Sequence, residues 1–181
     1  LVGSEMCIRD RYKKAIKEFP DYHGRIYVNI DDTGLGGGVT DRLREVKRED
    51  KLSRLYVVPI NAAEKIETDT KAGKDAAEHY NNLTTHMWAV LKDLMENQEI
   101  EIEEDSETFA QLSSRKYFLA SNGKLELESK KEMKKRGLDS PDRGDAAALS
   151  VYLGKIKKYT GSAPNQANTD GLGKISYWKN R

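Results

Sequence analysis

The sequence lacks the features that mark several classes of protein. Cys7 is the only cysteine in 181 residues, so no disulfide can form within the chain. No apolar run approaches the length of a membrane span, and 34% of the residues are charged, so neither a membrane partner nor secretion is expected. With 31 basic and 30 acidic residues the net charge is close to zero, so composition does not indicate a nucleic-acid-binding protein. Any contact with DNA has to come from local clusters of basic residues.

The two ends of the chain differ from its middle. Residues 1–11 (LVGSEMCIRDR) are too short and too charged for a signal peptide. They resemble a translated sequencing adaptor, which predicts a non-native leader outside the fold. Residues 12–159 then form a single domain, which opens on the last turns of a helix at residues 12–19. Residues 160–181 have the composition of a disordered tail.

Between these ends, hydrophobic periodicity predicts strands that alternate with helices. Strand-like runs occupy residues 25–31, 55–59 and 99–103. Helical spacing predicts five further helices, at residues 39–46, 75–97, 106–112, 129–136 and 140–158. A hairpin is predicted for residues 116–128, because Asn122-Gly123 supplies the backbone of a tight reversal. Strands separated by helices, with one hairpin, predict an α/β fold with a mixed sheet.

The first predicted strand ends on two carboxylates and a glycine-rich turn. Asp31 closes the strand, Asp32 follows it, and residues 33–38 (TGLGGG) form a turn that glycine adopts most easily. In open α/β sheets, ligands and metals gather at the C-terminal ends of strands. A dinucleotide-binding loop is rejected, because Val39 takes its last glycine position and the aspartates would repel a pyrophosphate. A functional carboxylate and a plain turn capped by Asp31 both stay open, as does the choice between Asp31 and Asp32.

The last predicted helix carries a second carboxylate site. Ser140 is a suitable N-cap, Pro141 fits the first helical position, and Asp142 in the first turn suits the helix dipole. Asp145 is harder to explain by structure alone, because it shares the inward helix face with three apolar residues, Leu149, Tyr152 and Ile156. A carboxylate on that face is costly unless it is paired or bound to a cation. The pattern therefore favours a functional acid at Asp145.

Together the two sites predict a metal-dependent phosphodiesterase. Asp31 and Asp145 can share two divalent ions about 3.5–4 Å apart, which activate a water and stabilise the leaving oxygen. Ligands that are all oxygen favour Mg²⁺ or Mn²⁺. Such a site usually has at least three carboxylates, and these arguments supply two.

A basic segment precedes the second site. Residues 129–136 (SKKEMKKR) hold five basic residues, Lys130, Lys131, Lys134, Lys135 and Arg136, and Arg143 follows in the next helix. Such a run is most often a solvated helix face. Beside a phosphodiesterase site, it predicts contacts with DNA phosphates that are independent of base sequence.

Three blocks of the sequence resemble, in this order, the nuclease domain of the large terminase subunits of tailed phages. They are IYVNIDDTGLGGGVTDRL, YNNLTTHMWAVLKDLM and LELESKKEMKKRGLDSPDRGDAAALSV, and the resemblance runs over residues 12–151. It implies an RNase H-like (RuvC-like) fold, in which a mixed sheet is flanked by helices and a hairpin precedes the last helices. The resemblance leads us to expect that the first strands of that fold are missing from this chain.

The resemblance also implies roles for individual residues. Asp31 matches the second catalytic acid, in the D-x-T-G block, and Asp145 matches the final one, in SPD-x-x-DA. Asp142 is a neighbour that assists, and Gly144 stands where the family more often has alanine. The family's first catalytic aspartate lies on an earlier strand, so we expect this polypeptide to be a poor nuclease although its full-length parent is an active one.

For the parent protein, the resemblance implies cutting of concatemeric double-stranded viral DNA during packaging. Its partners would be a portal protein and a small terminase subunit, in a ring-shaped homo-oligomer on the procapsid in the host cytoplasm. Two alternatives stay open: another RNase H-like nuclease, such as a junction resolvase, and a non-catalytic DNA-binding or docking module.

Overall fold

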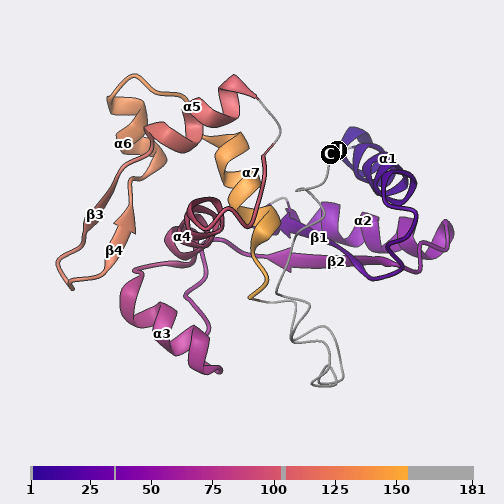
Figure 1. Cartoon of the computed structure of the whole chain (residues 1–181), viewed down its shortest axis with the longest axis horizontal. Coiled ribbons are helices and arrows are strands. Elements are labelled where there is room, and N and C mark those ends of the chain that lie inside the picture. Colours follow the sequence, from indigo (N-terminus) through magenta and orange to yellow (C-terminus); the bar gives the residue numbers. More distant parts are fainter. Residues whose placement is uncertain (1, 35, 103–104, 155–181) are drawn as a thin grey trace. The chain divides into compact units, whose positions relative to one another are not determined.

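A computed structural model describes residues 2–34, 36–102 and 105–154. The predicted tail at residues 160–181 and the predicted helix end at residues 155–158 lie outside these ranges. Contacts divide the chain into two compact units, Leu1–Ala62 and Ala63–Arg181, and each is described by itself (Figure 1). Among the described residues, no helix has the length and apolar character needed to cross a bilayer.

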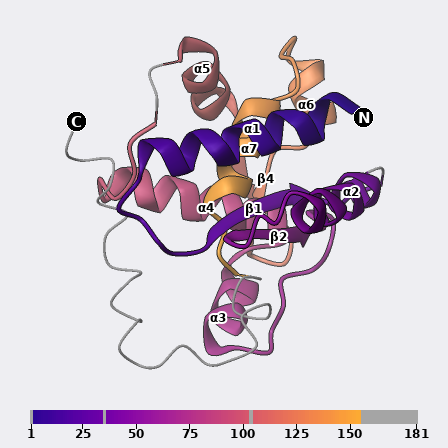
Figure 2. The same cartoon turned by 90° about the vertical axis from the view of Figure 1, so that its right-hand side faces the viewer.

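The first unit is built on two parallel strands. Strand β1 (Ile26–Asp31) pairs with β2 (Leu55–Ile60), with Asp31 opposite Ile60 at the carboxyl end. Helix α2 (Gly36–Glu49) connects the two strands and runs alongside them (Figures 1 and 2). A parallel pair needs such a crossover, because a short turn cannot bring the chain back to the start of the next strand. The strands predicted at residues 25–31 and 55–59 are confirmed.

Helix α1 (Val2–Glu18) completes the first unit and packs on α2. Tyr12 is buried in a core with Leu43 and Leu55, and Ile8 and Ile16 pack against that core. These three residues of α1 are four positions apart, so they form one stripe along the helix. The stripe extends from Ile16 back to Ile8, so α1 runs across the boundary predicted at residue 11. The non-native origin of residues 1–11 stays a prediction.

The glycine-rich segment is only partly a turn. We expected a turn over residues 33–38 and a helix from Val39, but α2 begins at Gly36. Gly34 has φ +68°, which glycine adopts without strain, and the chain reverses there. The later glycines follow helical geometry instead of the predicted turn.

The second unit is mainly helical. Its helices are α3 (Lys71–His79), α4 (Leu83–Glu96), α5 (Ser106–Ser114), α6 (Lys130–Lys135) and α7 (Asp142–Val151). Helix α7 packs against both α4 and α5. The helices predicted at residues 106–112 and 129–136 are confirmed, and α7 ends earlier than the predicted residue 158.

Two predictions in this unit are wrong. The single helix predicted at residues 75–97 is two helices, because Tyr80 is extended and Asn82 caps α4 by accepting a hydrogen bond from the Thr85 amide. Side-chain capping by asparagine competes with continued helix. The strand predicted at residues 99–103 is absent from its described part, residues 99–102.

The predicted hairpin is confirmed. Strand β3 (Tyr117–Leu119) pairs antiparallel with β4 (Leu125–Leu127), and Gly123 has φ +77° in the connecting turn. In the described ranges the four strands form two separate two-stranded sheets, one parallel and one antiparallel, instead of one mixed sheet. The α/β class is confirmed.

Candidate functional site

The first candidate carboxylate lies where β1 ends. Asp31 is exposed, and its Oδ1 accepts a hydrogen bond from the Thr33 amide at 3.0 Å. Because β1 and β2 are parallel, their carboxyl ends meet at one edge, and Asn61 follows β2 there. The Thr33 hydroxyl lies 3.3 Å from the Asn61 side-chain oxygen. This edge of the first unit therefore gathers oxygen atoms that suit a hard cation.

The neighbouring Asp32 has a structural partner. Its Oδ1 accepts a hydrogen bond from the hydroxyl of Thr40 at 2.8 Å, and Thr40 is buried inside α2. Asp32 therefore ties the turn to α2, whereas the side chain of Asp31 accepts from a main-chain amide two residues ahead. This difference favours Asp31 over Asp32 as the carboxylate available to a ligand.

The second candidate carboxylate, Asp145, lies in the first turn of α7. Its Oδ1 accepts hydrogen bonds from the indole Nε1 of Trp88 at 2.9 Å and from Nη1 of Arg115 at 2.7 Å. Its Oδ2 lies 2.9 Å from Nζ of Lys130. The side chain is 27% exposed. The sequence predicts that an inward carboxylate here needs a partner, and the structure supplies three.

Arg115 was not anticipated from the sequence. It follows α5, its side chain is only 5% exposed, and its guanidinium lies 4.8 Å from the centre of the Trp88 ring. Its Nε donates to the main-chain oxygen of Glu128 at 3.0 Å. Burial lowers the pKa of Arg115, and the charge of Asp145 opposes that shift. An inward aspartate signals that a partner exists, but only the fold shows that a residue thirty positions earlier provides it.

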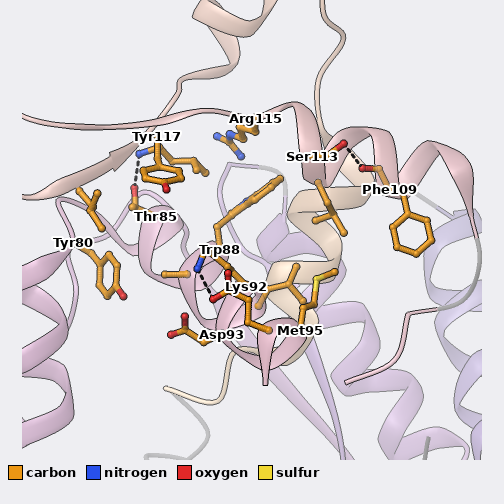
Figure 3. A pocket seen from close by; sticks show the side chains of 16 residues that line it. Tyr80, Thr85, Trp88, Lys92, Asp93, Met95, Phe109, Ser113, Arg115 and Tyr117 are labelled. Carbon is orange, nitrogen blue, oxygen red and sulfur yellow. Dashed lines mark hydrogen bonds and ion pairs between the residues drawn. The ribbon is translucent and has the colours of Figure 1, made fainter. Parts of the chain in front are cut away.

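Trp88 and Arg115 also line a pocket of about 480 Å³ in the second unit (Figure 3). The pocket lies among residues of α4, α5 and the hairpin, and most of its lining is apolar. Trp88 is 8% exposed. The polar edge of the indole, Nε1, donates the hydrogen bond to Asp145.

Asp142 lies outside the group formed by Asp145, Trp88 and Arg115. Its side chain is 76% exposed, and its Oδ1 accepts from the Ser140 hydroxyl at 2.6 Å and pairs with Lys130 at 3.2 Å. Those two contacts, the hydroxyl first, lower the pKa of Asp142. Ser140 is not the N-cap that we predicted, because its hydroxyl is turned to Asp142 and Pro141 occupies the capping position without a side-chain bond.

The predicted DNA-binding residues fall into two groups. Lys131, Lys134 and Lys135 are exposed on α6, and the ion pairs found within the described ranges do not include them. Lys130 bridges Asp142 and Asp145.

The two arginines have internal partners. Arg136 donates to the buried carboxylate of Glu128, and Arg143 pairs with Asp105 at 2.7 Å and Glu107 at 2.8 Å. Glu128 is 6% exposed, and the bond from Arg136 lowers its pKa. These contacts give Arg136 and Arg143 structural roles that a charge count in the sequence does not reveal.

The fit to a divalent cation differs between the two oxygens of Asp145. Oδ1 is held by two buried donors, whereas the partner found for Oδ2 among the described residues is Lys130, whose side chain is 53% exposed. A cation would therefore bind at Oδ2 and displace the ammonium. In the described part of the chain, no three His, Cys, Asp or Glu side chains form a ready metal cluster. Asp31 belongs to the first unit and Asp145 to the second, so their convergence stays a prediction.

Comparison with known proteins shows which known fold the chain is similar to. The sequence matches no family model and no curated protein. The structure is similar to the nuclease domain of the large terminase subunit gp2 of bacterial virus Sf6, with a TM-score of 0.55 and 20% identity over 78% of this chain and 69% of that domain.

Two further structures of the same viral domain match similarly. A lysine-to-alanine variant with manganese and β-thujaplicinol gives a TM-score of 0.54 and 19% identity, over 70% of this chain and 64% of that chain. A form with calcium gives 0.54 and 18%, over 78% and 69%. The chain thus spans about two thirds of the length of these domains. The predicted resemblance is confirmed at the level of the fold, which is that of a terminase nuclease domain.

Proposed function

We propose that the chain is the nuclease domain of a viral DNA-packaging terminase, whose full-length protein hydrolyses phosphodiester bonds of double-stranded DNA with two divalent ions, Mg²⁺ or Mn²⁺. The observation that carries the proposal is a terminase-nuclease fold with an exposed aspartate at the end of β1 and a donor-held aspartate at the start of α7. A fold alone does not define an activity, so the site residues have to be tested directly.

In this proposal Asp31 and Asp145 hold the metal ions. Both offer carboxylate oxygen, the ligand that Mg²⁺ and Mn²⁺ prefer. Bound ions would activate a water molecule and stabilise the leaving oxygen. Asp142 would hold the Lys130 ammonium once a cation displaces it from Asp145, because the same ammonium contacts both carboxylates. Asp142 therefore assists and is not assigned as a ligand.

DNA contact is assigned to the exposed face of α6. Lys131, Lys134 and Lys135 point their charge into solvent within a few residues of Lys130, which contacts Asp145. Lysines on such a face neutralise phosphates without reading the bases. Arg136 and Arg143 are left out of this surface, because each already has carboxylate partners within the unit.

The wider assignments follow from the proposed family alone. The substrate is concatemeric viral DNA, cut during packaging, and the partners of the full-length protein are a portal protein and a small terminase subunit. The parent protein works as a ring homo-oligomer on the procapsid in the host cytoplasm.

One observation favours a different function, a DNA-binding module without catalysis. Arg115 and Lys130 form ion pairs with the two oxygens of Asp145. If that pairing is the whole role of Asp145, then divalent ions have no high-affinity site and DNA binding by α6 is all that remains. Metal affinity separates the two functions.

The test measures Mn²⁺ affinity by calorimetry and Mn²⁺-dependent nicking of supercoiled plasmid. Asp31→Asn and Asp145→Asn should each weaken Mn²⁺ binding and abolish whatever nicking the chain shows. Asp41→Asn, exposed on α2, and Asp75→Asn, exposed on α3, are matched controls within the two units and should leave both measurements unchanged. Mn²⁺ affinity that is equal in all five proteins would overturn the nuclease proposal in favour of the module.

A further inference from the structure

The contact between Trp88 and Asp145 joins the middle of α4 to the start of α7. Trp88 is 8% exposed, and its only polar side-chain atom, Nε1, donates to Oδ1 of Asp145 at 2.9 Å. A buried indole needs a partner for its N–H, and an aspartate Oδ1 provides a charge-assisted one. The bond therefore fixes the rotation of the carboxylate as well as satisfying the indole.

Gly144 makes this contact possible. A Cβ atom at this position would lie 2.7 Å from Cη2 and 3.0 Å from Cζ2 of Trp88, closer than carbon atoms approach one another. The indole is rigid, so an alanine here would push the whole ring away from α7. Because Trp88 also lines the pocket, open space is available for the displaced ring. The neighbouring Trp88 thus explains why position 144 is a glycine, although the family that the sequence resembles more often has alanine there.

Arg115 holds the same carboxylate oxygen from another direction. Its Nη1 donates to Oδ1 at 2.7 Å, its Nε is anchored on the Glu128 main chain, and its guanidinium lies over the Trp88 ring. Two fixed donors therefore share Oδ1. The other oxygen, Oδ2, pairs with Lys130, whose side chain is exposed.

We propose that Trp88, Arg115 and Gly144 are positioning residues that lock Oδ1 of Asp145 and so present Oδ2 to the catalytic cation. The inference rests on the proposed nuclease function, and it assigns to these residues a role that acts only through Asp145. Partners that orient a metal-binding side chain typically change metal affinity or activity by about 10–100-fold when they are removed.

The decisive variants are Gly144→Ala, Trp88→Phe and their combination. Phenylalanine lacks the N–H donor and the outer ring atoms that an alanine Cβ would meet. Gly144→Ala alone and Trp88→Phe alone should each weaken Mn²⁺ affinity by about tenfold or more. The double variant should bind Mn²⁺ no more weakly than Trp88→Phe, because the added methyl group then has nothing left to displace. Gly38→Ala, at a helical glycine with nothing within 4 Å, is the matched control and should bind as the wild type does.

Two independent measurements accompany the affinities. The indole ¹H–¹⁵N signal of Trp88, distinguished from that of the chain's other tryptophan by Trp178→Phe, should shift in Gly144→Ala and in Asp145→Ala. Thermal unfolding of every variant shows whether it is folded. A role in stability alone would lower the melting temperature and leave the Mn²⁺ affinity of the folded protein unchanged.

The outcomes separate the two proposals. Wild-type protein that binds Mn²⁺, with unchanged affinity in Gly144→Ala and Trp88→Phe, would overturn the positioning role and leave the nuclease proposal standing. The positioning role would also be overturned if the two substitutions weakened Mn²⁺ affinity additively in the double variant, or if the Trp88 indole signal did not shift in Asp145→Ala. Wild-type protein that binds no Mn²⁺ would overturn the nuclease function itself.

Discussion

Replacing Arg115 by methionine tests whether the buried ion pair beside α7 is as important to stability as its geometry indicates. Methionine keeps an unbranched apolar stem but removes the cation and its hydrogen bonds. Removing the charge-assisted bond to Asp145 costs about 1.5–3 kcal/mol, and removing the buried guanidinium over Trp88 costs about 2 kcal/mol, the value for a desolvated cation–π contact.

The other contacts of Asp145 reduce this total free-energy cost. Its side chain is 27% exposed and keeps its contacts with Trp88 and Lys130, so its charge is not left fully unpaired. Breaking a completely buried pair costs more than breaking one that water can reach. We therefore expect Arg115→Met to lower the free energy of unfolding by about 2–4 kcal/mol. For a chain of this size, that corresponds to a fall in melting temperature of about 4–16 °C.

The assay is thermal unfolding followed by circular dichroism, with Arg143→Met as the matched control. Arg143 also pairs with two carboxylates, Asp105 and Glu107, but its side chain is 52% exposed. Exposed pairs contribute little, because solvent screens them, so Arg143→Met should leave the melting temperature nearly unchanged. Equal effects of the two substitutions would refute the reasoning, because burial would then not decide the strength of these pairs.

Two further predictions concern pH and DNA. The ring of His86 stacks on that of Tyr80, with the ring centroids 5.3 Å apart, and meets the Tyr152 ring edge-on, with the centroids 5.7 Å apart. Burial lowers the pKa of His86, and the charge of Asp93 opposes that shift more weakly. Because the unfolded chain then binds the proton more tightly, the free energy of unfolding should fall as pH drops below about 6.5 and level off below the folded-state pKa. His86→Gln should remove that component from melting temperatures measured between neutral and mildly acidic pH; an unchanged profile would contradict it. Replacing the three exposed lysines of α6 by glutamine should weaken DNA binding and reduce the slope of log affinity against log salt by about 0.9 for each DNA phosphate that the variant no longer neutralises. Fluorescence anisotropy checks this against a control that removes equal charge, Lys65, Lys71 and Lys74 to glutamine, which should keep the wild-type slope.

The parts of the fold that depend on local pattern were predictable. The alternation around β1, the apolar run of β2 and the Asn122-Gly123 reversal each specify their structure within a few residues. Errors arose where a side chain far along the sequence, or a cap, decides the outcome. The break between α3 and α4 occurs where Asn82 caps α4 and Tyr80 forms a bridge to Leu125, far along the chain. Periodicity alone cannot show such a contact.

The candidate site was likewise predictable only in part. The position of Asp145 on an inward face follows from helical spacing, and its need for a partner follows from the cost of burying a carboxylate. The identity of the partners does not, because Trp88 and Arg115 lie 57 and 30 positions away. Likewise, a count of charges places Arg136 on a basic surface, whereas the buried carboxylate of Glu128 binds it within the unit.

The central claim is that Asp31 and Asp145 bind the same divalent ions, and paramagnetic broadening by Mn²⁺ tests it most directly. In ¹⁵N-labelled protein, the backbone amide signals of both residues should lose intensity together at the same low ratio of Mn²⁺ to protein. Broadening at only one of the two aspartates, or at each in a different range of Mn²⁺ concentration, would contradict a shared metal site.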